Sequence, residues 1–381
     1  MGSALVSGRI FTRKASMLAA SSLLAVAGLA GCADAGSVEA GAGGADCIAA
    51  ADEHMAAYRE LPTRLPAGYT PLQARPKAGT VIYVGFGAQP ADADIGKGME
   101  EAAASVGWDY SFISHDGTVE DINSKFMDAV NRRPTAIAWS GTPAAAIQEP
   151  LEAAAKAGIA VMAAAVPDQP TGIPGFAGVT SDALEYSRIG EVTANWVMAD
   201  SGCSAKAVIV GLPYPVLQAQ ATSFVDTLKN GCEACDATYI EVQGKDVGTP
   251  AATNAIISAI QSDPSIRYVS INVGVLATGV REALAAVGLN DVVVFGLSPD
   301  ANAIKALQDG KDAMWLGGSS RALGYELFDG VLRIQDSGEV FTGLPKLVSL
   351  LTPENVPTDV TDAVAYPLDF DKQFHALWHV G

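Results

Sequence analysis

Two cysteines stand at the spacing of a redox or metal-binding pair. Cys232 and Cys235 are separated by two residues in a CxxC arrangement. A redox pair of this kind opens a helix after a strand, where the helix N-terminus lowers the thiol pKa, whereas this pair follows a predicted helix. A structural zinc site needs further cysteine or histidine ligands at a comparable spacing, and the sequence places none beside the pair. We therefore expect neither redox chemistry nor metal binding here.

Motifs for nucleotide chemistry and hydrolysis are absent from the sequence. Gly85-Phe86-Gly87 lacks the third glycine of a dinucleotide fingerprint, and neither a GxxxxGK[ST] loop nor a GxSxG elbow occurs. His375 and His379 stand one helical turn apart, but no third ligand motif accompanies them. We therefore expect no catalytic residues, no metal and no cofactor, and the protein is not predicted to be an enzyme.

The composition is that of an acidic globular chain. Among its 381 residues, 24 Lys and Arg stand against 42 Asp and Glu, which gives a formal net charge of −18. A nucleic-acid-binding protein would carry a basic face toward the phosphates, so that class is excluded. Hydrophobic residues make up 49% of the chain, enough to bury cores, and the length fits two domains of ~100–200 residues each.

The first 31 residues have the pattern of a signal peptide. Arg9, Arg13 and Lys14 precede an apolar stretch over 17–30, which is too short to span a bilayer. The stretch ends in Leu-Ala-Gly-Cys32, which resembles the bacterial lipobox, whose cysteine is acylated and becomes the mature N-terminus. We therefore expect removal of 1–31, lipidation of Cys32, a flexible tether over 32–46 and an extracytoplasmic location on the cell membrane.

Export would place the remaining cysteines in an oxidising compartment, where disulfides form. Cys47, Cys203, Cys232 and Cys235 allow three complete pairings. Cys203 precedes a predicted strand, and Cys232 and Cys235 follow the next helix. We therefore expect Cys203 to pair with Cys232 or Cys235, while the role of Cys47 stays open.

Apolar strands alternate with helices between residues 80 and 317. Strands are predicted at 80–87, 108–114, 135–139, 159–166 and 176–179, and again at 206–211, 237–242, 268–272, 292–296 and 313–317. Such alternation predicts parallel sheets with helices on both faces. The fold class is therefore α/β, with two doubly wound parallel-sheet lobes and a cleft between them. A helix and a Pro-rich connector over 47–79 precede the first lobe.

Five segments resemble a known family in their order and spacing. They are YVGFGAQPADADIGKGMEEAAASVGW, AIAWSGTPAAAIQEPLEAAAKAGIAVM, VSINVGVLATGVREALAAVGL, VVVFGLSPDANAIKALQDGKDAM and PLDFDKQFHALWHV. From Thr80 to its end the chain resembles the type I periplasmic binding proteins of ABC importers, particularly the ribose/xylose/autoinducer-like sugar-binding branch. The resemblance implies a three-stranded hinge, with crossings near Thr180–Ser181, Gly317–Gly318 and Pro345–Val348. Lobe one would then comprise 80–180 plus 319–345, and lobe two 181–317 plus 346–381.

The resemblance also implies a binding site in lobe one, with several departures. Gln89 stands where the sugar binders have a hydrogen-bonding Asn, and Asp92 where they have a sugar-stacking Phe. Ser140 and Thr142 match a loop that lines the cleft. Val166, preceded by an alanine, stands in place of an Asp-Arg pair that grips hydroxyls, with Asp168 slightly later.

In lobe two the implied site has also lost charged groups. Gln218 falls where an Arg is usual, Asn272 matches an Asn, Ser298 replaces an Asp, and Gly317 replaces a Gln. Aromatic side chains near the strand ends are candidates to stack on a ring: Phe86, Trp139, Tyr214 and Trp315. Core packing is the alternative for each of them, and Tyr214 is favoured as a ligand contact because it lies in a loop between two prolines.

These features predict a solute-binding lipoprotein that closes around a small molecule by hinge motion and delivers it to an ABC permease. The ligand is sugar-like by resemblance, and the depleted set of charged groups makes a less polar ligand a competitor. We expect a monomer that contacts membrane lipid through Cys32. The alternative is a receptor that presents its ligand to a membrane signalling protein, and the sequence does not separate these two functions.

Overall fold

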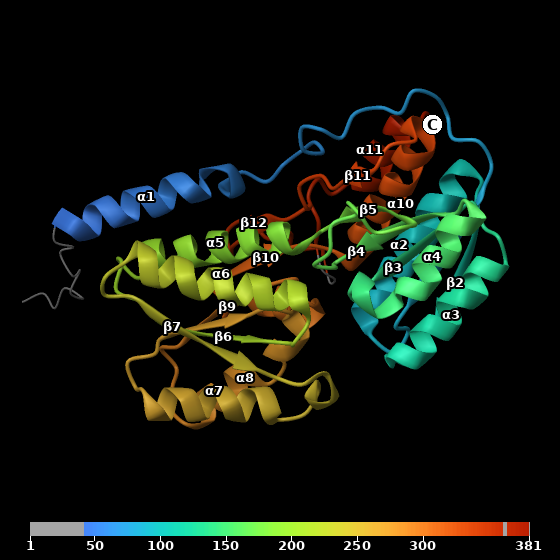
Figure 1. The fold of residues 1–381 in the computed structure, drawn as a ribbon. Coiled ribbons are helices and arrows are strands. Elements are labelled where there is room, and N and C mark those ends of the chain that lie inside the picture. The colour runs from blue at the N-terminus through green and yellow to red at the C-terminus, as the bar shows by residue number, and fades with distance from the viewer. Residues whose placement is uncertain (1–41, 361–363, 381) are drawn as a thin grey trace, which may run out of the picture. The chain divides into compact units, whose positions relative to one another are not determined.

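The computed structural model describes residues 42–360 and 364–380. The predicted signal peptide and Cys32 lie outside the described residues. Helix α1 (Ala42–Arg59) begins inside the predicted tether, and an extended connector leads from it to the first strand (Figure 1). No helix of the described part of the chain combines the length and the apolar character needed to cross a membrane.

Lobe one is built on a six-stranded sheet. Its strands are β1 (Thr80–Gly85), β2 (Asp109–Ser114), β3 (Ala136–Ser140), β4 (Ala160–Ala164), β5 (Phe176–Thr180) and β11 (Phe341–Thr342), all paired in parallel. Both faces are covered, because alternate residues of β1 enter separate cores. Val81 and Tyr83 pack with α2 (Pro90–Val106) and α10 (Ser320–Ser337), whereas Ile82 and Val84 pack with α3 (Val119–Asn131) and α4 (Gln148–Ala157).

Lobe two repeats this architecture. Its strands are β6 (Lys206–Gly211), β7 (Asp236–Glu241), β8 (Tyr268–Ile271), β9 (Val293–Leu297), β10 (Met314–Gly317) and β12 (Ser349–Leu351), and only β12 runs antiparallel to its neighbour. Its helices are α5 (Ala183–Asp200), α6 (Pro215–Gly231), α7 (Ala251–Ser262), α8 (Val280–Ala286) and α9 (Ala301–Gln308). Helices α5 and α6 cover one face of the sheet, and α7 and α8 cover the other (Figure 1).

The strand order decides where a ligand can bind. The sheets run β11-β5-β4-β3-β1-β2 and β12-β10-β9-β8-β6-β7. In each, the chain goes from the first strand to one neighbour and then returns to the other, so the loops after β1 and β3, and after β6 and β8, diverge to opposite faces. Open α/β sheets bind ligands at this switch point, beyond the carboxyl ends of the strands.

Three crossings connect the two sheets. The chain leaves β5 for α5, leaves β10 for α10, and passes from β11 to β12. These crossings fall near residues 180–183, 317–320 and 342–349, as the resemblance implied. The fold is therefore two doubly wound α/β lobes joined by a three-stranded hinge.

The C-terminal tail divides between the two lobes. Strand β12 pairs with β10 in lobe two. Helix α11 (Phe370–Leu377) packs instead on α10 of lobe one, where the Trp378 ring stacks on Tyr325 at 6.0 Å between centroids and meets Phe328 edge-on at 5.7 Å. This differs from the expectation that all of 346–381 belongs to lobe two. The apolar face of α11 is short, so the sequence alone did not show which sheet it covers.

The cysteine pairing also differs from the expectation. Cys203 is bonded to Cys47 of α1, and Cys232 is bonded to Cys235. The expected pairing of Cys203 with Cys232 or Cys235 is therefore wrong in this structure. It assumed that neighbours in sequence pair, whereas α1 packs on α5 through Ala51 and Met55 and brings Cys47 to the end of that helix.

The two disulfides should differ in their effect on stability. The Cys47–Cys203 bond closes a separation of 156 residues and the Cys232–Cys235 bond one of 3, and loop-closure entropy grows with loop length. We predict that replacing Cys47 and Cys203 by Ser lowers the free energy of unfolding by about 2–4 kcal/mol, and that the matched Cys232/Cys235 double replacement has a smaller effect. Denaturant unfolding measures both, and non-reducing peptide mapping that links Cys203 to Cys232 or Cys235 would refute the pairing.

Candidate functional site

A cavity of about 260 Å³ is lined by the loops at both switch points. The loops after β1 and β3 contribute from lobe one, and those after β6 and β8 contribute from lobe two. Eight residues singled out from the sequence lie on its wall: Phe86, Gln89, Asp92, Ser140, Thr142, Tyr214, Asn272 and Ser298. Residues from the hinge crossings, among them Gly318, Ser319 and Lys346, complete the wall.

Four expected residues do not line the cavity. Val166 is fully buried in the core against α3 and α4, and its neighbour Ala165 takes the place on the wall. The Asp168 carboxylate accepts a hydrogen bond from the Ala144 backbone N–H at 2.8 Å. Gln218 points to Glu241 at 3.4 Å on the outer side of α6. Gly317 is the last residue of β10, where a Cβ would come within 2.6 Å of the Leu351 side chain.

Of the four aromatic candidates, two reach the cavity. Phe86 and Tyr214 lie on its wall. Trp139 and Trp315 are fully buried core residues, and their indole N–H groups donate to the Thr142 carbonyl and the Asp312 carboxylate. Aromatic character at a strand end therefore did not separate Phe86, which lies on the wall, from the two tryptophans, which lie in the core.

Asp92 holds the lobe-one side of the site together. Its carboxylate accepts hydrogen bonds from the Tyr83 hydroxyl on β1, the Ser140 hydroxyl at the end of β3 and the Phe86 backbone N–H. The Tyr83 hydroxyl also lies 2.9 Å from the Ser140 hydroxyl. Burial and the Asp92 charge raise the pKa of Tyr83 well above its ordinary value, so this hydroxyl stays a donor. Both carboxylate oxygens of Asp92 are thus occupied within the protein.

His115 lies on the cavity wall and carries a donor without a partner among the described residues. Its Nδ1 accepts a hydrogen bond from the Gly117 backbone N–H at 3.0 Å, which places the proton on Nε2. Burial lowers the pKa of His115, so the ring is neutral near pH 7, and it stacks on Phe86 at 5.6 Å between centroids. The Nε2 atom is buried and has no partner among the described residues.

Asn272 of lobe two also lies on the cavity wall and carries a donor without a partner among the described residues. Its Oδ1 accepts a hydrogen bond from the Leu212 backbone N–H at 3.3 Å, and its buried Nδ2 has no partner among the residues that the structure describes. The amide fits because Gly211 has no Cβ, which would come within 1.9 Å of Nδ2. Buried polar groups of native proteins are nearly always paired, so an unpaired amide on a cavity wall is a candidate ligand contact.

Two non-glycine residues on the wall have left-handed backbone. Ala165 follows β4 with φ 54°, and Ser298 follows β9 with φ 50°. They occupy equivalent places in the two lobes, at the carboxyl end of the fourth strand of each sheet. Such conformations cost about 1–3 kcal/mol each and gather at functional sites, so the strained turns support the assignment of this cavity.

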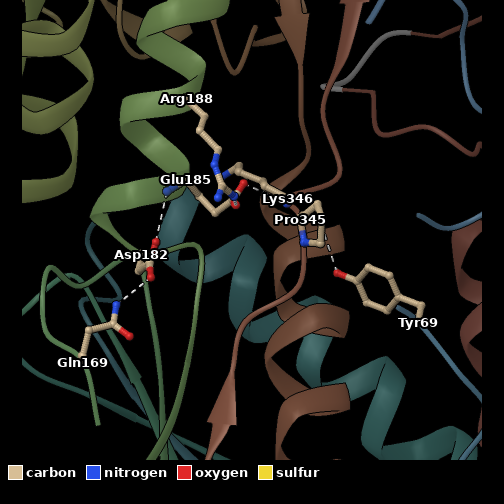
Figure 2. Close-up of polar contacts among 7 residues, drawn as sticks. All are labelled: Tyr69, Gln169, Asp182, Glu185, Arg188, Pro345 and Lys346. Atoms are coloured by element: carbon tan, nitrogen blue, oxygen red, sulfur yellow. Dashed lines mark hydrogen bonds and ion pairs between the residues drawn. The ribbon is translucent and has the colours of Figure 1, made fainter. Parts of the chain in front are cut away.

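The first and third crossings meet in a network of polar side chains (Figure 2). Asp182 accepts from the Glu185 backbone N–H at 3.0 Å to cap α5, and from the Gln169 amide of lobe one at 2.6 Å. Glu185 pairs with Arg188 and accepts from the Lys346 backbone N–H at 3.4 Å. The Tyr69 hydroxyl of the connector donates to the Pro345 carbonyl at 3.4 Å. The network ties both crossings to lobe one and to α5.

Sequence reasoning missed two charged residues, Lys346 on the cavity wall and the buried Glu326 near it. Lys346 lines the cavity, and its ammonium lies 3.2 Å from the Tyr186 hydroxyl. Glu326 of α10 is 3% exposed, and one carboxylate oxygen accepts from the Leu347 backbone N–H at 3.2 Å while the other is unpaired among the described residues. The one feature of the sequence that could have indicated Lys346 is that it is the single charged residue in the otherwise largely apolar segment 344–351.

Burial raises the pKa of Glu326 from 4.5 to about 7, against the lowering effects of Lys346 and the Leu347 N–H. Because the folded protein keeps this proton to higher pH than the unfolded chain, the stabilisation present below pH 4.5 is lost as pH rises to about 7. At 1.36 kcal/mol per pKa unit the loss is about 3 kcal/mol.

We predict that Glu326→Gln flattens this dependence and raises the free energy of unfolding at pH 8 by about 1–3 kcal/mol. Urea unfolding between pH 4.5 and 8 measures it, with the exposed Glu152→Gln as a matched control. Parallel stability curves for the wild type and Glu326→Gln would contradict the prediction.

Comparison with known proteins gives a family match over most of the chain. Residues 81–339 match the model of the family described as "Periplasmic binding protein domain". No curated protein matches the chain.

Solved structures match the fold at low sequence identity. A glucose-galactose binding protein from Geobacillus stearothermophilus is 16% identical with a TM-score of 0.61, covering 74% of this chain and 100% of that one. A solute-binding protein from Burkholderia graminis, in complex with D-arabinose, is 16% identical with a TM-score of 0.64, covering 74% and 98%. A periplasmic ribose ABC transporter protein from Conexibacter woesei is 19% identical with a TM-score of 0.60, covering 76% and 95%.

Proposed function

Because the chain belongs to the periplasmic binding protein domain family, we propose that it captures a small molecule between its two lobes and delivers it to an ABC permease. One observation carries the proposal: the cavity wall is built from the switch-point loops of both sheets. The Gln89 amide of lobe one donates to the Tyr214 hydroxyl of lobe two at 3.1 Å across it. A ligand held there contacts both lobes at once.

Capture in this fold is a population shift about the hinge. A ligand favours the state in which it contacts both lobes, and it shifts the equilibrium by its difference in affinity between the two states. The three crossings supply the hinge, and Lys346 on the third also lines the cavity. The protein therefore acts by binding, with no chemical step of its own.

The location follows from the N-terminal pattern. The pattern of a signal peptide over 1–31 and the lipobox-like Leu-Ala-Gly-Cys32 support a mature protein outside the cytoplasm that is anchored to the cell membrane by acyl chains. The anchor keeps a single folded chain beside its permease in the same membrane.

Asn272 and Gln218 give a matched test of the site. We predict that Asn272→Ala weakens ligand binding by ~1–3 kcal/mol, because a buried ligand group loses its partner. Gln218→Ala, which changes a residue outside the cavity, should leave affinity unchanged.

The ligand for this test comes from a thermal-shift screen of the full chain in detergent with sugars, polyols, aromatic acids and nucleosides. A ligand at 100 times its Kd adds about 2.7 kcal/mol to the folded state. Isothermal titration with each variant then gives the affinities. Equal loss in both variants, or no loss in Asn272→Ala, would contradict the proposed site.

A further inference from the structure

Lys346 brings a positive charge to the cavity and has no ion-pair partner within 42–360 and 364–380. Its ammonium donates to the Tyr186 hydroxyl at 3.2 Å and lies 4.7 Å from the centre of the Tyr186 ring. No carboxylate oxygen of the described residues lies within ion-pair distance of this nitrogen. Neighbouring Tyr186, Glu326 and Glu185 outweigh burial and raise the pKa of Lys346, so the group stays charged. Lys346 is half-buried, and a partly desolvated charge is stabilised by a partner of opposite charge.

The nearby carboxylates are engaged elsewhere. Glu185 pairs with Arg188 and receives the backbone N–H of Lys346, rather than its ammonium (Figure 2). Glu326 receives the Leu347 N–H, and its raised pKa leaves it partly protonated near pH 7. Both therefore act on the ammonium only at longer range, without forming an ion pair with it.

The other polar groups of the wall favour acceptors in the ligand. Asp92, the one acidic residue of the described wall, has both oxygens occupied by Tyr83, Ser140 and Phe86. The unpaired groups, His115 Nε2–H and the Asn272 amide, are donors. Each hydroxyl of a neutral polyol brings one proton as well as two lone pairs, and these protons meet no free carboxylate on the described wall.

The remaining wall is largely apolar. Phe86 and Tyr214 offer rings, and aliphatic side chains complete the surface: Ile95, Leu212, Leu217 and Leu323. Such a surface favours a ligand with an aromatic ring or an acyl chain over a ligand that carries many hydroxyl groups.

We propose that the ligand is a small organic acid, whose carboxylate binds the Lys346 ammonium and whose aromatic or acyl body packs against the apolar wall. This inference rests on the proposed function, because it names the class of molecule that the cavity captures. The charge-assisted hydrogen bond from Lys346 selects the acid, and the donors of His115 and Asn272 favour further acceptor atoms.

The test uses matched pairs of probes on the full chain in detergent. Phenylacetate and phenylacetamide share a phenyl ring and differ in charge. Gluconate and D-glucose also differ in charge, but both are hydroxylated and lack an apolar ring. Isothermal titration should show phenylacetate binding at least 10-fold more tightly than phenylacetamide, and more tightly than gluconate. This comparison needs no variant, so it does not depend on the folding of a mutant.

Variants then assign the effect to one side chain. Lys346→Met should remove the preference for phenylacetate, Lys346→Arg should retain most of it, and Lys372→Met, an exposed lysine of α11, should leave it unchanged. Equal affinity for the acid and the amide, tighter binding of gluconate than of phenylacetate, or an unaltered preference in Lys346→Met would overturn the inference.

The two proposals fail in different ways. Tight binding of D-glucose or D-arabinose that is unaffected by Lys346→Met would refute the acidic ligand and leave capture between the lobes standing. Absence of binding by every probe, including the sugars, would contradict the proposed function and this inference together.

Discussion

The structure depends on one topological constraint, the return of the chain past its own first strand in each sheet. Because β1 lies between β2 and β3, and β6 between β7 and β8, the loops after these strands separate to opposite faces and leave a crevice at the sheet edge. The three crossings join the two sheets, and the loops at both switch points line one cavity. The place of the cavity therefore follows from strand order.

Much of this could be predicted from the sequence, for a local reason. Buried parallel strands are continuous apolar runs and their helices have a helical period, so the alternation identified the fold class. Polar residues directly after a strand, such as Ser140 and Asn272, lie on the wall because the strand end fixes their position, and their contact with a ligand stays a prediction. Val166 was misplaced by one residue, because the left-handed turn at Ala165 points its side chain into the core.

The features that escaped prediction depend on contacts between distant segments. Cys47 reaches Cys203 only because α1 docks on α5, and His115 and Lys346 reach the cavity from a loop and a hinge crossing whose sequences carry no motif. Asp92 was expected to contact the ligand, yet its carboxylate is consumed by Tyr83, Ser140 and Phe86. It orients the loop after β1, and the charge that faces the cavity is the positive one of Lys346.

Capture between the lobes requires that one ligand order both switch points together. Hydrogen–deuterium exchange of the full chain, with and without the ligand that stabilises it most, tests this directly. We predict slower exchange at 86–89 after β1 and, at the same ligand concentration, at 212–214 after β6 and 272–273 after β8. Slower exchange confined to one lobe, or none at a saturating concentration, would contradict it.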